Sequence, residues 1–324
     1  MRAVRCNQHG LPDTLVVENL PSPVPEADEV LISVRAAGVN FPDSLIIQNK
    51  YQFKPPLPFT PGGELAGVVI AVGPGVTRYA VGQSVIAFTG WGAFAEEVAV
   101  HQDKLIPMPD QMPFDVAGTF LMTYGTSYHA FKDRAQLAAN ETVLVLGAAG
   151  GIGIAAIELA KAFGARVIAA ASSDEKLAVC KAHGADEVIN YLTEDLRERI
   201  KAITGGNGVD VVCDPVGGRY SELALRSMAW RGRFLVVGFA DGDIPKIPLN
   251  LALLKGCSII GVFWGDFVRR EPEQAAADLQ ALVGLYRDGK IKPLVSGSYT
   301  LDQAGDALYA LMQRKVSGKI AIIP

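Results

Sequence analysis

Between residues 142 and 261, apolar strand-like runs alternate with stretches that have helical spacing. This alternation is typical of an α/β domain in which helices cover a doubly wound parallel sheet, so it constrains the fold more than any other feature. We expect strands at 143–146, 166–171, 187–190, 209–213, 234–237 and 258–261, and helices at 154–163 and 175–183.

A glycine-rich loop joins the first of these strands to the first helix. It reads GAAGGIG at 147–153, and its best register against the dinucleotide-binding pattern GxGxxG has alanine at the first glycine position. Gly150 would let backbone N–H groups approach a pyrophosphate, and Gly153 would let the helix pack closely on the strand. The βαβ context and the positive end of the helix favour a dinucleotide site over a turn without a ligand. The loop residues expected to contact the cofactor are Ala149, Gly150, Gly151 and Ile152.

The end of the second strand indicates which dinucleotide binds. NAD enzymes usually carry an acidic residue there for the ribose hydroxyls, but this strand ends at Ala171. Hydroxyls and a positive charge follow, which suit a 2′-phosphate: Ser172, Ser173 and Lys176. Asp174 and Glu175 fit the first turn of the next helix instead. We therefore expect NADPH rather than NADH, although Lys176 could also be an ordinary surface lysine.

The rest of the chain differs from this segment. Residues 1–120 contain short apolar runs closely punctuated by glycine and proline, which is typical of a β-rich domain with many loops. After 261, helical stretches at 272–287 and 301–314 lead to a closing strand at 319–323. No repeat or low-complexity segment interrupts this order.

Composition excludes several classes of partner. The chain of 324 residues is 49% apolar and has a net charge of −4, so no basic surface for nucleic acid is expected. It has no apolar signal core at its start and no uncharged run of about 20 residues to span a membrane. The cysteines are scattered, which fits free thiols in the cytoplasm: they are Cys6, Cys180, Cys213 and Cys257. The histidines are equally dispersed and have no partner at a recognisable spacing.

Three segments together resemble the medium-chain dehydrogenase/reductase superfamily: Gly38–Asp43, Thr60–Gly67 and Asp210–Gly218. Within it, the chain is most similar to the zinc-free quinone oxidoreductases related to zeta-crystallin, through Ile189–Tyr191 and the ending Arg314–Lys319. This resemblance implies a GroES-like catalytic domain over 1–122, completed by 265–324, and a Rossmann domain over 123–264. It also implies a homodimer or tetramer built through the last Rossmann strand.

The zinc-dependent branch of that superfamily has a cysteine where this chain has Asn40 and a histidine where it has Gly63. Neither replacement is a useful zinc ligand, so we expect no bound metal. Zinc normally stabilises the alkoxide charge that appears when a ketone is reduced. Without it, an acceptor that spreads its own charge, such as a quinone or an α,β-unsaturated carbonyl, is favoured.

The resemblance also implies the residues of the catalytic site. Asn40 faces the nicotinamide, Asp43 lies one turn further along a short helix, and Tyr51 occupies the place of a proton-donating tyrosine. Stabilising the helix N-terminus would equally explain Asp43, and a half-buried aromatic would equally explain Tyr51. Leu45 and Ile47 are expected to make the substrate pocket apolar.

Further cofactor contacts are implied in the same way, although ordinary core, surface or interface positions would also account for them. Thr126 is expected near the nicotinamide, and Tyr191 and Arg314 near the adenosine phosphate. The remaining expected contacts are Val216, Phe239, Phe263 and Trp264.

The favoured function is an NADPH-dependent reductase of a small hydrophobic quinone or other conjugated carbonyl. A 2-enoyl thioester or alkenal reductase on the same scaffold is the neighbouring alternative. A non-catalytic protein that binds a nucleotide or RNA, as a zeta-crystallin relative, is the alternative from another class, and the negative net charge argues against the RNA partner.

Overall fold

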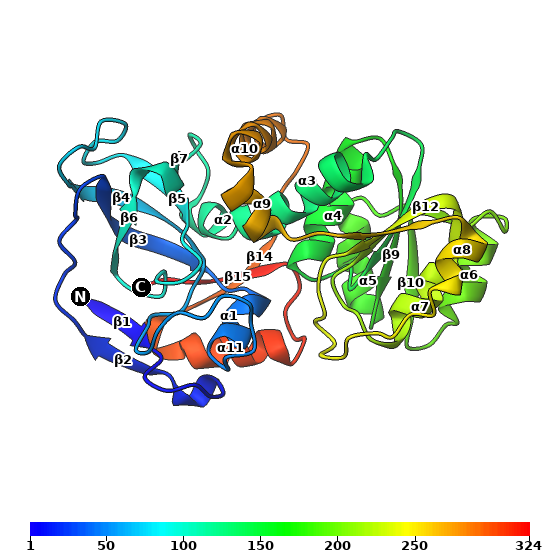
Figure 1. Ribbon diagram of the computed structural model, residues 1–324, viewed down its shortest axis with the longest axis horizontal. Coiled ribbons are helices and arrows are strands. Elements are labelled where there is room, and N and C mark those ends of the chain that lie inside the picture. Colours follow the sequence, from blue (N-terminus) through cyan, green and yellow to red (C-terminus); the bar gives the residue numbers. More distant parts are fainter. The chain divides into compact units, whose positions relative to one another are not determined.

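The alternating segment forms a six-stranded sheet in which every neighbouring pair of strands is parallel. The computed structural model describes residues 1–324, and Figure 1 shows this sheet with helices on both of its faces. The strand order β10-β9-β8-β11-β12-β13 confirms the doubly wound arrangement, with the first strand in the middle. The bounds are β8 Thr142–Leu146, β9 Arg166–Ala171, β10 Glu187–Asn190, β11 Val209–Asp214, β12 Met228–Val236 and β13 Ser258–Gly261.

The two predicted helices are present, and α4 begins earlier than expected. It covers Gly151–Ala162, so the glycines of the loop form its first turn, and α5 covers Asp174–Ala182. Short helices between the later strands were not predicted, because each has only six to eight residues and buries few apolar side chains. They are α6 Leu196–Ile203, α7 Arg219–Arg226 and α8 Asn250–Lys255.

The contact between α4 and the strand before it depends on one glycine. A Cβ atom on Gly153 would lie 2.4 Å from the carbonyl carbon of Ala148, a distance that real side chains do not adopt. The helix can therefore approach the sheet only because this position has no side chain. Leu144 and Leu146 of β8 are buried in a core cluster with side chains from the helices between the later strands.

The second unit of the chain comprises Met1–Met122 and Leu294–Pro324. Its main sheet has the order β14-β15-β3-β4-β5-β7, with β6 also paired to β3, and β1 pairs with β2 separately. The bounds of the strands are β1 Arg2–Arg5, β2 Val16–Asn19, β3 Glu29–Gly38, β4 Glu64–Val72, β5 Ser84–Phe88, β6 Glu97–His101, β7 Leu105–Pro107, β14 Val295–Tyr299 and β15 Lys319–Ile322. The helices are α1 Phe41–Ile46, α2 Phe114–Gly118 and α11 Ala304–Met312.

One expected domain boundary is wrong. The chain was expected to rejoin its N-terminal part at 265, but residues 265–293 belong to the unit Thr123–Pro293. Helices α9 (Trp264–Arg270) and α10 (Pro272–Arg287) pack on each other, and α10 contacts α3 (Thr126–His129) of the same unit. An ion pair of 2.5 Å between Lys132 and Asp278 adds to that contact. No helix in the chain has the length and apolar character that crossing a membrane requires.

Candidate active site

The N-terminus of α1 brings two of the predicted catalytic residues together. Asn40 precedes the helix with an extended backbone, and its N–H donates to the Asp43 carboxylate over 2.7 Å. Pro42 in the first turn suits this position because it needs no hydrogen-bond partner for nitrogen. Asp43 therefore stabilises the helix N-terminus, and it does so while only 1% exposed.

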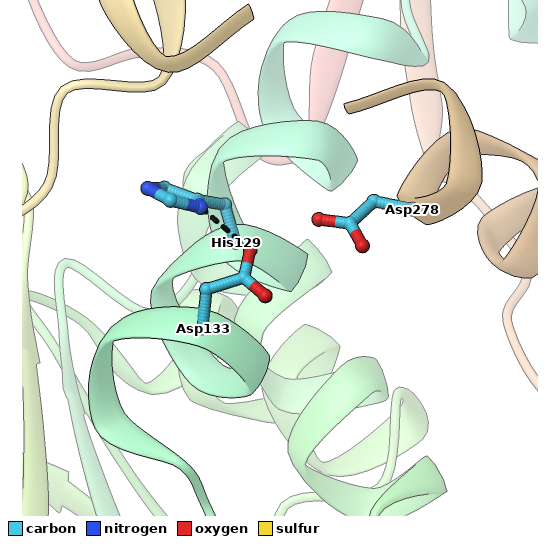
Figure 2. Close-up of side chains that lie close together, drawn as sticks. All are labelled: His129, Asp133 and Asp278. Atoms are coloured by element: carbon cyan, nitrogen blue, oxygen red, sulfur yellow. Dashed lines mark hydrogen bonds and ion pairs between the residues drawn. The ribbon is translucent and has the colours of Figure 1, made fainter. Parts of the chain in front are cut away.

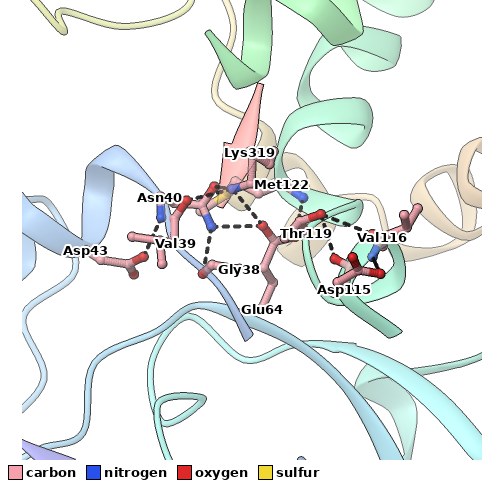
Figure 3. Close-up of polar contacts among 10 residues, drawn as sticks. All are labelled: Gly38, Val39, Asn40, Asp43, Glu64, Asp115, Val116, Thr119, Met122 and Lys319. Atoms are coloured by element: carbon pink, nitrogen blue, oxygen red, sulfur yellow. Dashed lines mark hydrogen bonds and ion pairs between the residues drawn. The ribbon is translucent and has the colours of Figure 1, made fainter. Parts of the chain in front are cut away.

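The Asn40 side chain lies at the centre of a buried polar network (Figure 3). Its amide Nδ2 donates to Glu64 Oε1 over 2.8 Å and to the Gly38 carbonyl over 3.3 Å. Lys319 Nζ donates to Asn40 Oδ1 over 2.5 Å and to the Val39 carbonyl over 2.8 Å. Asn40, Glu64 and Lys319 are all buried, so the network is closed to water.

The Glu64 carboxylate is held from three sides. Besides Asn40, its Oε1 faces the Lys319 ammonium at 3.2 Å, and its Oε2 accepts the Met122 backbone N–H over 2.9 Å. A Cβ on Gly38 would lie 2.5 Å from Glu64 Oε1, so the carboxylate needs the glycine to fit. Lys319 was not predicted as a site residue, although a single lysine that opens the apolar strand Lys319–Ile322 was a usable signal.

Burial changes the acid–base character of this site. It raises the pKa of Asp43 from 3.8 to about 7; the Asn40 backbone N–H and the Lys319 charge oppose this shift, and Glu64 adds to it. Burial also raises the pKa of the Tyr51 phenol, and the nearby Asp43 charge raises it further. Asp43 thus exchanges its proton near neutral pH.

Tyr51 differs from Asn40 in having an available donor. Both N–H bonds of the Asn40 amide point to protein acceptors, whereas the Tyr51 hydroxyl makes no hydrogen bond within the chain. The Tyr51 ring is half-buried and tilted against Phe53. Of the two residues expected to line an apolar pocket, Leu45 is half-buried, but Ile47 is fully buried in the core and cannot contact a substrate.

In the other unit, the glycine loop presents an uncapped helix end. Gly150 precedes α4 with an extended backbone, and no side chain caps the helix. A Cβ on Gly150 would meet only the Gly147 carbonyl, at 3.4 Å, so the space above the loop is open. Free N–H groups at such an end suit a pyrophosphate.

Several predicted cofactor residues surround this loop. A Cβ on Gly147 would lie 2.6 Å from Val216 Cγ2, and one on Gly217 would lie 2.9 Å from the Phe239 ring. The Ser127 hydroxyl, next to Thr126, donates to the Ile152 carbonyl over 3.4 Å. The structure thus brings the segments after β8 and β11 together at one edge of the sheet.

Trp264 and Phe263 occupy different environments. Trp264 is buried and lies against Gly125, where a Cβ would approach its ring to 2.6 Å, whereas Phe263 is 44% exposed. Arg314 lies in the C-terminal segment Leu294–Pro324, which belongs to the same unit as Asn40, and has a left-handed backbone with φ of 58°.

The end of β9 collects the residues expected to select the cofactor. Lys176 Nζ donates to Ser172 Oγ over 3.3 Å, and the Tyr191 N–H donates to the Ala171 carbonyl. Ser173 is committed to capping α5, since its hydroxyl accepts the Lys176 N–H. Asp174 accepts a hydrogen bond from Asn190 over 2.9 Å.

Sequence reasoning missed two residues beside Tyr191. The Tyr220 ring lies 4.3 Å from the Tyr191 ring, and Arg219 lies over Tyr220 at 4.8 Å. Their position directly after the glycine pair Gly217–Gly218, at the start of α7, was the available signal.

Three histidines have carboxylate partners, which corrects the expectation of histidines without a recognisable partner; His101 Nδ1 lies 3.5 Å from Asp103 Oδ2. His183 bonds Glu158 over 2.6 Å. His129 bonds Asp133 over 2.7 Å, and Asp278 from α10 lies beside them (Figure 2). Lys132 pairs with Asp278 in turn, so each carboxylate of this cluster already has a basic partner.

Comparisons with known proteins agree with this arrangement. Residues 26–110 match the alcohol dehydrogenase GroES-like domain family, and residues 151–281 match the zinc-binding dehydrogenase family. The quinone oxidoreductase-like protein 2 homolog of Nematostella vectensis is 38% identical, over 99% of this chain and 88% of the relative. The quinone oxidoreductase of Homo sapiens is 33% identical, over 95% and 92%.

A solved structure gives the same result. Quinone oxidoreductase of Escherichia coli, crystallised in complex with NADPH, has a TM-score of 0.94 at 30% identity and covers 100% of both chains. The GroES-like sheet, the doubly wound sheet and the similarity along nearly the whole chain lead to one conclusion. The chain belongs to the quinone oxidoreductase branch of the medium-chain dehydrogenase/reductase superfamily.

Proposed function

We propose that this protein is an NADPH-dependent reductase that transfers hydride to a quinone or another conjugated carbonyl without a metal. The observation that carries this proposal is the Asn40–Lys319–Glu64 network, in which the buried cation is an ammonium. Membership of the family supports a redox reaction. The network supports a conjugated acceptor, because it offers an ammonium where a zinc ion would otherwise balance the charge.

The residues around the glycine loop fit NADPH. The uncapped N-terminus of α4 and the open space at Gly150 suit the pyrophosphate. Ser172 and Lys176 offer a donor and a positive charge for the 2′-phosphate, and the last residue of β9 is Ala171 rather than an acidic residue. NADPH would supply the hydride, and the protein binds and orients it.

The donor set argues against a metal at Asn40. Zinc prefers thiolate, imidazole or carboxylate, and here only Glu64 qualifies. Its carboxylate is already neutralised by Lys319 and accepts two N–H groups. Charge that develops on the acceptor must therefore be spread within the acceptor itself or met by hydrogen bonds, as quinones and α,β-unsaturated carbonyls allow.

Tyr51 and Asp43 would manage the proton. The Tyr51 hydroxyl has no partner in the chain, so it can donate to an oxygen or protonate an enolate. Asp43, with its pKa raised to about 7, lies close enough to influence the Tyr51 phenol and would be partly protonated at neutral pH. Asn40 would act by supporting this helix end rather than by donating to substrate.

The alternative acceptor is a 2-enoyl thioester or an alkenal, because the half-buried Leu45 and Tyr51 suit any small apolar conjugated compound. The free cysteines, of which Cys6, Cys180 and Cys213 are buried, support a reducing location such as the cytoplasm.

The test measures NADPH oxidation with 1,2-naphthoquinone, a 2-alkenal and crotonyl-CoA in parallel, using wild type and Tyr51→Phe. We expect turnover with at least one acceptor. With an enone, loss of the hydroxyl should lower kcat by about 10²–10³ if it meets the developing charge, and by less with the quinone. No oxidation with any acceptor would favour the non-catalytic alternative. If the rates of wild type and Tyr51→Phe agree within about twofold, Tyr51 only lines the pocket.

A further inference from the structure

We propose that Lys319 is a positioning residue of this site: its buried ammonium holds Asn40, Val39 and Glu64 in the one arrangement that orients the N-terminus of α1. The inference rests on the proposed function, because it explains how the reductase site is held. Lys319 lies on β15, far in sequence from the strand β3 and helix α1 that it joins (Figure 3).

The Lys319 ammonium makes two hydrogen bonds and one ion pair inside the site. An ammonium has three N–H bonds. The three acceptors within reach are the Val39 carbonyl at 2.8 Å, Asn40 Oδ1 at 2.5 Å and Glu64 Oε1 at 3.2 Å. Because the side chain is buried and its ammonium is directed at these three groups, Lys319 acts through its neighbours and not on the reacting atoms.

The ammonium also decides which way the Asn40 amide points. With Oδ1 on Lys319, Nδ2 must face Glu64 and Gly38, and a flipped amide would place N–H against the ammonium. The backbone of the same residue donates to Asp43. Lys319 therefore fixes the residue that begins the helix carrying Asp43.

Burial makes this arrangement depend on both charges. The Lys319 side chain is 8% exposed and the Glu64 side chain 0%. Removing only the ammonium would leave a buried, unpaired carboxylate, which is strongly destabilising. Removing both charges avoids that defect but still removes the ammonium from Asn40 and Val39. The charged and titratable groups that face Asp43 are Glu64, Lys319 and Tyr51.

The test compares Lys319→Met, the double variant Lys319→Met/Glu64→Gln, and Lys315→Met as the control. Lys315 is an exposed lysine in the same C-terminal segment. The readouts are the melting temperature, the NADPH Kd from fluorescence quenching, and kcat with the best acceptor of the panel across pH 5–9. We expect Lys319→Met to lower the melting temperature by roughly 5 °C or more and the double variant to recover most of it.

The proposal predicts that the NADPH Kd of the double variant is within about threefold of the wild-type Kd. Its kcat should remain at least about tenfold below the wild-type kcat. Its pH profile should also be displaced, because two groups that influence Asp43 are gone. A double variant with wild-type kcat and pH profile would overturn the proposal, since Lys319 would then only neutralise Glu64. Wild-type protein inactive with every acceptor would instead refute the proposed function, while the melting temperatures would still report on the network.

Discussion

At the scale of single residues, the site depends on an imbalance of charge. Two buried carboxyl groups, Asp43 and Glu64, share one ammonium, Lys319. Lys319 contacts Glu64 directly, and so Asp43 is left in a buried position where its charged form is unfavourable. A pKa of about 7 follows for Asp43, which makes it the group whose proton state changes under ordinary conditions.

The raised pKa predicts a specific dependence of stability on pH. Between 3.8 and about 7 the folded chain keeps a proton on Asp43 that the unfolded chain has released. The stability linked to that proton is present in full below 3.8 and is lost as the pH rises through 7. The free energy of unfolding of Asp43→Asn, measured by urea unfolding, should therefore rise by roughly 2 kcal/mol relative to that of wild type as the pH increases from 5 to 7.

The control for this experiment is Asp306→Asn, at an exposed aspartate that also lies in the first turn of a helix. Its pH dependence should follow that of wild type. An Asp43→Asn curve parallel to wild type from pH 5 to 8 would show that Asp43 is ionised throughout that range.

Lys176 carries the prediction about the cofactor. Its ammonium donates a hydrogen bond to the Ser172 hydroxyl after the end of β9, where a 2′-phosphate would be bound. Lys176→Glu puts a negative charge there and should weaken NADPH by at least tenfold more than NADH. Fluorescence titrations with both cofactors measure this, with Lys181→Glu on the same helix as the control. Equal weakening of both cofactors by Lys176→Glu would remove this residue from the 2′-phosphate site.

At the scale of elements, the parallel strands could be predicted well because their apolar runs are buried on both faces and need no distant partner to be recognised. Helices α6, α7 and α8 could not, since sequences as short as theirs become helical mainly through tertiary contacts. The boundary at 293 escaped prediction for a similar reason: the packing of α10 on α3 is invisible in the sequence.

In the candidate site, too, some features could be predicted from the sequence and others could not. Asn40, Asp43 and Tyr51 could be selected by their resemblance to family residues. That Asp43 caps α1 could be predicted from its place directly after Pro42, at the start of the helix. A lone lysine at the start of an apolar strand marks Lys319 in the sequence, but its contacts could not be predicted because they depend on β15 lying beside β3.

The close approach of α4 to its sheet gives a prediction for one element. Gly153→Ala introduces a Cβ against the Ala148 backbone and should lower the melting temperature by several degrees. Gly284→Ala in α10 is the matched control, because a Cβ there meets nothing within 4 Å. The control should be neutral or slightly stabilising, by up to about 1 kcal/mol. Equal melting temperatures for the two variants would mean that α4 shifts without cost.

At the scale of the whole molecule, we propose that two chains pair through β13. This strand ends the parallel sheet and pairs only with β12, and Ile259 on it is 41% exposed. Trp230, Leu253 and Leu254 add exposed apolar surface on β12 and α8. An uncovered edge of this kind invites a second copy, related by a two-fold axis.

Light scattering at micromolar concentration should therefore give a dimer or a tetramer. Ile259→Lys should shift the mass toward the monomer, because a charged lysine on an edge strand disfavours pairing with another strand. Val81→Lys, at an exposed apolar residue of the other unit, should leave the mass unchanged. A monomeric wild type would contradict pairing through this edge.

The central claim is that the protein reduces conjugated acceptors without a metal, and one measurement tests it most directly. Protein treated with a chelator is analysed for zinc and then assayed for NADPH oxidation with 1,2-naphthoquinone, a 2-alkenal and a saturated ketone. The Asn40–Lys319–Glu64 network predicts no stoichiometric zinc, full activity with a conjugated acceptor and none with the saturated ketone. About one zinc per chain before treatment, with activity lost on chelation and restored by zinc, would contradict the account.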